Sequence, residues 1–114
     1  MKTAKEYLAE ANAVVPRISS DVGIAKHDAG SSLFIDVRDS SDIAKSGTIA
    51  GALCIPRGFL EFAADETLPY FNANLNKDAD IVLVCAAGGQ AALAGKTLKD
   101  MGYKNVCNVG GITD

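Results

Sequence analysis

Closely spaced cysteines are absent from this sequence. Cys54, Cys85 and Cys107 lie far apart, are odd in number and form no CxxC motif, which argues against a disulfide framework and against a zinc site. Histidine is almost absent as well, since His27 stands alone. Nothing around His27 supports a role as the base of a cysteine hydrolase, and we interpret it as an exposed residue of a helix.

Features of nucleic-acid-binding proteins and membrane proteins are missing too. The chain contains no basic tract and no basic residues interleaved with aromatic ones, so we expect no nucleic acid partner. Its longest apolar stretches have the length of strands, far short of a membrane span. The charged start at residues 1–6 has no apolar signal core behind it. We therefore expect a cytoplasmic protein that binds no membrane.

What the chain does contain suits one folded domain. It has 114 residues, of which 48% are hydrophobic, and its 11 basic and 14 acidic side chains leave a net charge of -3. This size and this apolar fraction are enough for a hydrophobic core. We predict one domain over residues 1–114, with an N-terminal helix within 1–16 and the core of the domain in 17–114.

Strand-like and helix-like patterns alternate along the sequence. Apolar runs predict strands at residues 33–37, 52–55, 81–84 and 106–109. Helical spacing, caps and breakers predict helices at 3–14, from 20 or 21 to near 30, and at 39–45, 59–64 and 91–101. Gly102 stands where a left-handed C-cap belongs. Because the strands are apolar throughout, we predict an α/β fold with a parallel sheet covered by helices on both faces.

Cys85 is the residue with the clearest chemical signal. It follows the apolar run 81–84 and precedes a loop of small residues and the helix 91–101. This order places the sulfur above a ring of backbone N–H groups, which belong to Ala86, Ala87, Gly88, Gly89, Gln90 and Ala91. Glycine lets such amides turn inward, and amides at a helix start bind anions. We therefore expect a nucleophilic thiolate at neutral pH, and expect the same amides to hold the terminal sulfur of a persulfide.

Other chemically notable residues have less specific interpretations. Cys54 and Cys107 lie inside apolar strands, so we expect both to serve core packing. Asp36 and Arg38 end the first strand, and we interpret them as a structural ion pair rather than as an acid and a base. Arg57 follows another strand end, where it could steer an anion toward the Cys85 loop or face the solvent.

Four segments of the sequence stand in a familiar order and spacing. They are LFIDVRD at 33–39, GTIAGA at 47–52 with CIPRG at 54–58, CAAGGQ at 85–90, and LKDMGY at 98–103 with VGGI at 109–112. Over about residues 18–112 the sequence thereby resembles a single-domain rhodanese, a sulfurtransferase. The resemblance implies a central parallel five-stranded sheet between helices. It also implies that Cys85 takes a sulfane sulfur as a persulfide and passes it on.

The resemblance also implies the partners of the reaction. The donor would be thiosulfate or a persulfide, the acceptor would be cyanide, a thiol or a sulfur-accepting protein, and no metal or organic cofactor would be needed. Members of the family often carry a cation in the loop, where this chain has Ala86, Ala87 and Gln90. A dianion such as thiosulfate would then depend on backbone amides and Arg57, so we expect a persulfide to be the better donor. Thr48 stands where the family usually has a histidine.

Two alternative functions remain open at this point. The first is a non-catalytic rhodanese-like module that carries sulfur or binds proteins. The uncharged loop favours it, and the retained cysteine argues against it. The second is a cysteine phosphatase of the dual-specificity type, whose loop is one residue longer and ends in an arginine that clamps phosphate. Here Ala91 occupies that position, and no arginine follows Arg57.

Overall fold

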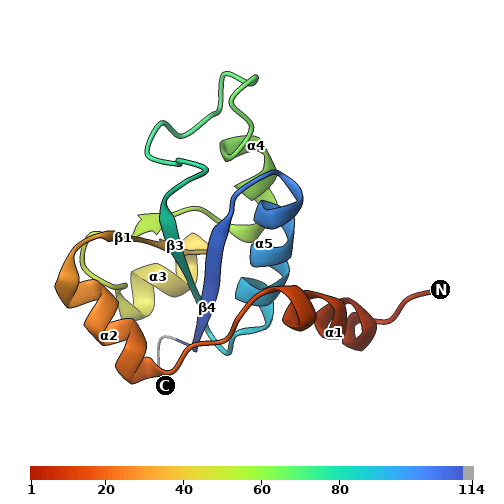
Figure 1. Ribbon diagram of the computed structural model, residues 1–114, viewed down its shortest axis with the longest axis horizontal. Helices are drawn as coiled ribbons and strands as arrows, with labels where there is room; N and C mark the ends of the chain where they lie inside the picture. Colours follow the sequence, from red (N-terminus) through yellow and green to blue (C-terminus); the bar gives the residue numbers. More distant parts are fainter. Residues whose placement is uncertain (112–114) are drawn as a thin grey trace.

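The sheet of this protein consists of parallel strands in the order β2-β1-β3-β4 (Figure 1). The computed structural model describes residues 1–111. The strands are β1 Ser32–Asp36, β2 Leu53–Cys54, β3 Asp80–Cys85 and β4 Asn105–Gly111. Ile112 of the last sequence motif and the end of the expected domain at residue 114 lie outside the described residues.

The expectation of five strands was wrong for the part of the chain that the structure describes, which contains four. Residues 16–18 run along the outer edge of β4, where a further strand could pair. Asn108 donates its N–H to the Pro16 carbonyl and accepts from the Ile18 N–H, both at 2.9 Å, but only one isolated bridge forms, between Arg17 and Asn108. Pro16 has no N–H to extend the pairing, and residues 15–19 alone separate two helices, so a full strand has no room.

The helices follow the predicted order. They are α1 Ala4–Val14, α2 Ser20–Ala29, α3 Ser40–Ser46, the 3₁₀ turn η1 Arg57–Phe59, α4 Leu60–Ala63 and α5 Gly89–Asp100. Thr3 forms a capping box at the start of α1. The predicted left-handed conformation of Gly102 is confirmed by its φ of 98°. The helix at the Cys85 loop begins at Gly89, two residues earlier than predicted, and β4 runs on to Gly111.

Helices cover both faces of the sheet, as predicted. On one face α4 and α5 pack over Leu83 and Ile35, while on the other Phe34, Val82 and Val84 form a second core beside α2. Residues 81–85 of β3 are all buried, which is the reason that this strand reads as a continuous apolar run. α1 lies outside α5 (Figure 1). Among residues 1–111, every helix falls short of the length and apolar character that crossing a membrane requires.

The contact between α1 and α5 depends on Gly95. A Cβ at this position would lie 2.8 Å from both γ-methyl groups of Val15, a stiff β-branched side chain that is itself buried. We expect Gly95→Ala to lower the free energy of unfolding by about 1–2 kcal/mol, because the overpacking cost exceeds the gain in helix propensity. Urea unfolding measures this, with Gly58→Ala as the control, because a Cβ at Gly58 meets nothing within 4 Å. A Gly95→Ala protein as stable as the Gly58→Ala protein would contradict the expectation.

Candidate active site

Cys85 ends β3 with its sulfur directly over the start of α5. The residue is a free cysteine and only 2% exposed. Its Sγ accepts hydrogen bonds from the backbone N–H of Gly88 at 2.9 Å and of Ala91 at 3.4 Å. Two of the six amides expected around the sulfur therefore donate to it. The amides come from the loop and from the first turn of the helix, so the helix dipole acts at the same point.

The loop after Cys85 turns on Gly88. This residue has φ 98° and ψ -16°, a left-handed conformation that side chains other than glycine rarely adopt. In this conformation its N–H points back at the sulfur while its carbonyl accepts the N–H of Ala92 at 3.0 Å, the first hydrogen bond of α5. Gly88 and Ala91 are buried, whereas Ala86, Ala87 and Gln90 are exposed on the outside of the loop. Two alanines and one glutamine, all uncharged, thus form the outer side of the loop.

Asn108 and Arg17 adjoin the loop, and sequence reasoning missed both. Asn108 of β4 is 1% exposed and donates from Nδ2 to the Gly88 carbonyl at 2.9 Å. A Cβ on Gly88 would lie 2.8 Å from Nη1 of Arg17, so the guanidinium lies against the outside of the turn. A signal for Asn108 was present, since it is the one polar residue within the apolar run 106–109.

Arg57, which the sequence left open between steering an anion and facing the solvent, lies beside the same helix but further along it. Its guanidinium donates to Glu61 at 2.9 Å and to Thr97 Oγ1 at 3.0 Å. Arg57 and Gly89 nevertheless line one hollow of about 530 Å³ between α1 and α5. The hollow also contains Lys2 and Lys96, but each of the three cations is paired with a carboxylate. The local charge is therefore close to neutral.

The predicted ion pair of Asp36 and Arg38 is confirmed, and it is part of a larger buried network. Arg38 is 4% exposed and Asp36 fully buried, with Arg38 Nη2 2.8 Å from Asp36 Oδ2. Thr48 Oγ1 donates to the same carboxylate at 2.7 Å. Burial disfavours the charged carboxylate, yet hydrogen bonds from Arg38 and Thr48 outweigh it and hold the pKa of Asp36 below its ordinary value of 3.8. The pair is structural, because both side chains are used within the network.

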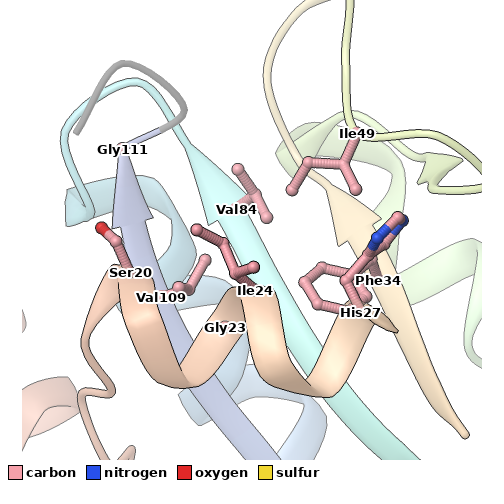
Figure 2. A pocket seen from close by; sticks show the side chains of 9 residues that line it. All are labelled: Ser20, Gly23, Ile24, His27, Phe34, Ile49, Val84, Val109 and Gly111. Carbon is pink, nitrogen blue, oxygen red and sulfur yellow. The ribbon is translucent and has the colours of Figure 1, made fainter. Parts of the chain in front are cut away.

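A second hollow, of about 330 Å³, lies between α2 and the sheet (Figure 2). Figure 2 shows Ser20 and Gly111 at one end and His27 with Phe34 at the other. The His27 ring donates from Nε2 to the Ala50 carbonyl at 2.9 Å and packs edge-on against Phe34. His27 is exposed, as expected, and these contacts hold it on the α2 side of the sheet.

The two remaining cysteines differ from each other. Cys107 is buried in β4 as predicted, and burial raises the pKa of its thiol. The prediction of core packing was wrong for Cys54, which is exposed. β2 is an edge strand of two residues, and therefore one side of it is open to solvent.

Comparison with known proteins relates this arrangement to one family. The family model described as the rhodanese-like domain matches residues 22–114 of this sequence. A candidate sulfur carrier protein of Bacillus subtilis (strain 168), YrkF, is 31% identical over 110 residues, which cover 96% of this chain and 55% of the relative. The chain thus spans about half the length of that relative.

Two solved structures are similar along most of the chain. One is a protein of unknown function from Rhodopseudomonas palustris CGA009, described as a possible tyrosine phosphatase. It has a TM-score of 0.92 and 35% identity, covering 97% of this chain and 86% of that one. The other is the human single-domain sulfurtransferase TSTD1, with a TM-score of 0.74 and 27% identity, covering 85% of this chain and 90% of that one.

Proposed function

This chain belongs to the rhodanese-like domain family, and from that premise we propose that it is a sulfurtransferase in which Cys85 carries the sulfur as a persulfide. The observation that carries the proposal is the pair of backbone N–H groups, from Gly88 and Ala91, directed at the Cys85 sulfur. Hydrogen bonds to an anion are stronger than those to a neutral group, so these amides favour the thiolate, the form that attacks sulfur.

The proposed reaction has two steps and regenerates the free cysteine. In the first step the Cys85 thiolate attacks the outer sulfur of the donor, the donor's S–S bond breaks, and sulfite or a thiolate leaves with the bonding electron pair. In the second step a cyanide or thiol acceptor attacks the terminal sulfur of the Cys85 persulfide. The S–S bond of the Cys85 persulfide then breaks, the sulfur leaves as thiocyanate or as a new persulfide, and Cys85 returns to the thiolate. This is covalent catalysis with ping-pong kinetics.

The loop's lack of charge leads us to propose a persulfide rather than thiosulfate as the preferred donor. Ala86, Ala87 and Gln90 supply no cation, and the Arg57 guanidinium is bound to Glu61 and Thr97. A dianion would have to be held without a side-chain cation from the loop itself, whereas the persulfide group of a small thiol carries at most one negative charge. The terminal sulfur on Cys85 needs only the amides that already face the site.

We expect glutathione persulfide to load Cys85 at least about tenfold faster than thiosulfate at equal concentration. This factor corresponds to the one charge-assisted hydrogen bond from a loop cation that thiosulfate lacks here. Stopped reactions measure this from the mass of the tryptic fragment 78–96, which contains Cys85 and no other cysteine and gains one sulfur atom when Cys85 is loaded. Gln90→Arg should raise the thiosulfate rate alone, while Gln90→Met, of similar length and uncharged, should change neither rate. Equal rates for the two donors in the unmodified protein would contradict the proposed donor class.

A sulfur carrier is the second candidate, and the similarity to the Bacillus subtilis protein favours it. A carrier would also form the Cys85 persulfide but would release the sulfur only to a protein partner. Repeated turnover with cyanide supports the enzyme, whereas a single stoichiometric loading without turnover supports the carrier. If Cys85 never gains a sulfur atom, both candidates fail.

Phosphatase activity is less well supported, although one similar structure is described as a possible tyrosine phosphatase. A phosphate clamp needs an arginine at the end of the loop, and the chain has Ala91 there. Hydrolysis of a phenyl phosphate by the unmodified protein but not by Cys85→Ser would overturn the sulfurtransferase proposal.

A further inference from the structure

Asn108 makes more specific contacts than packing in a strand requires. Its side chain is almost fully buried and both of its polar atoms are bonded, Nδ2 to the Gly88 carbonyl at 2.9 Å and Oδ1 to the Gly110 N–H at 2.8 Å. Its backbone pairs with the segment 16–18. One residue thus connects the Cys85 loop, the end of β4 and the N-terminal segment.

Asn108 lies where the pairing of β3 and β4 changes register. Leu83 pairs with Asn108, but the next residue of β3, Val84, pairs with Gly110, so Val109 is an extra residue in β4. Such bulges bend the strand that contains them and are common beside active sites. The Asn108 carboxamide, which accepts from the N–H two residues on, stabilises the bulge while its other end holds the loop.

The two glycines bonded to Asn108 are also the two covered by Arg17. Gly88 and Gly110 have φ of 98° and 94°, and a Cβ on either residue would meet the Arg17 guanidinium. The turn at Gly88 is therefore held from inside by the Asn108 carboxamide and covered from outside by Arg17. Because Gly88 has little intrinsic preference for one conformation, these external contacts select the one that it adopts.

We propose that Asn108 is a positioning residue for the Cys85 sulfur. By holding the Gly88 carbonyl, it keeps the Gly88 N–H directed at Sγ, where this N–H would stabilise negative charge on the reacting sulfur. Its place in the reaction rests on the proposed sulfurtransferase function. Without the carboxamide, the Gly88 carbonyl would keep only its hydrogen bond from the Ala92 N–H, and the Gly88 N–H would be held less firmly toward the sulfur, which weakens the shorter of the two hydrogen bonds to Sγ.

The rate at which Cys85 reacts with iodoacetamide tests this role, because only the thiolate is alkylated. Trypsin isolates Cys85 in residues 78–96, apart from Cys54 and Cys107. We expect Asn108→Leu, which is close in size, to react about tenfold more slowly at pH 7, the effect of one hydrogen bond to an ion. At a pH where every thiol is ionised, the rates of the two proteins should converge.

Val106→Ala is the matched control, because it removes buried side-chain atoms from the same strand and leaves both members of the Asn108–Gly88 hydrogen bond in place. Its alkylation rate at pH 7 should stay within about twofold of the unmodified protein, even where its stability falls. Equal rates for Asn108→Leu and the unmodified protein would overturn the proposal. An equal loss in both variants would also overturn it, because the effect would then be one of stability.

A measurement on the unmodified protein covers the case in which Asn108→Leu does not fold. We expect the NMR resonances of the Asn108 side-chain NH₂ and of the Gly88 N–H to move together as Cys85 is titrated, and to stay still in Cys85→Ala. An Asn108 signal that ignores the titration would overturn the proposal. Neither experiment requires sulfur transfer, so a protein that passes both but never gains sulfur refutes the proposed function alone.

Discussion

Replacing Cys85 with alanine should reduce sulfur transfer at least about a thousandfold, because the proposed covalent intermediate forms on the Cys85 sulfur. The rate of thiocyanate formation from glutathione persulfide and cyanide would fall to the uncatalysed level, whereas the unmodified protein would gain one sulfur atom on Cys85 and turn over. Folding should be affected little, because the substitution removes only one sulfur atom and therefore leaves only a small cavity.

Cys54→Ala provides the matched control for this result. Cys54 is exposed and lies at the edge of the sheet, so a persulfide can modify it without contributing to turnover. In the Cys54→Ala protein, the rate of sulfur transfer and the sulfur loading at Cys85 should both stay within about twofold of those of the unmodified protein. A Cys85→Ala protein that retains more than a tenth of the activity would show that the sulfur passes through another residue.

The sequence predicted the local part of this site and missed the part that depends on distant residues. The strand, the glycine turn and the helix after Cys85 are consecutive, so their pattern predicts amides facing the sulfur, and the Gly88 and Ala91 contacts agree. Asn108 and Arg17 reach Gly88 only after β4 and the N-terminal segment pair with each other. No spacing rule along the chain brings them together.

Two errors in the fold concern the edges of the sheet. Apolar strand patterns report burial, but they do not report which strand lies at the edge of the sheet. β2 is at the edge and shrinks to two residues, so Cys54 faces outward despite its apolar neighbours. The fifth strand was expected from family resemblance, but the segment around Pro16 is too short to form it, and Pro16 has no N–H to extend the pairing.

Thr48 shows how the chain tolerates a departure from the family pattern. Its hydroxyl donates to Asp36 at 2.7 Å, so the position still supplies a hydrogen bond to the buried carboxylate. Arg38 completes the surroundings of this carboxylate and also donates to Ser46 Oγ at 2.7 Å and to the Gly47 carbonyl at 2.8 Å. The network therefore joins the end of β1 to the segment that follows α3.

Removal of the Arg38 guanidinium should have the largest effect on stability. In Arg38→Met the Asp36 carboxylate would remain buried without its charge partner, which costs about 3–5 kcal/mol at neutral pH. That is a large part of the 5–15 kcal/mol that is typical of a small domain. Urea unfolding measures the loss. Arg38→Lys keeps the charge but not the paired N–H donors, so its free energy of unfolding should lie between those of the unmodified protein and Arg38→Met.

The pH dependence of this loss tests its electrostatic origin. In the unmodified protein the pKa of Asp36 is lowered, so its stabilising contribution is complete above the unfolded value of 3.8 and is lost as the pH falls through the folded value. In Arg38→Met, burial would instead raise the pKa of Asp36, and protonation would relieve the unpaired charge. The difference in stability between the two proteins should therefore narrow as the pH drops toward and below 3.8. A difference that stays constant with pH would mean that Arg38 acts through packing rather than charge.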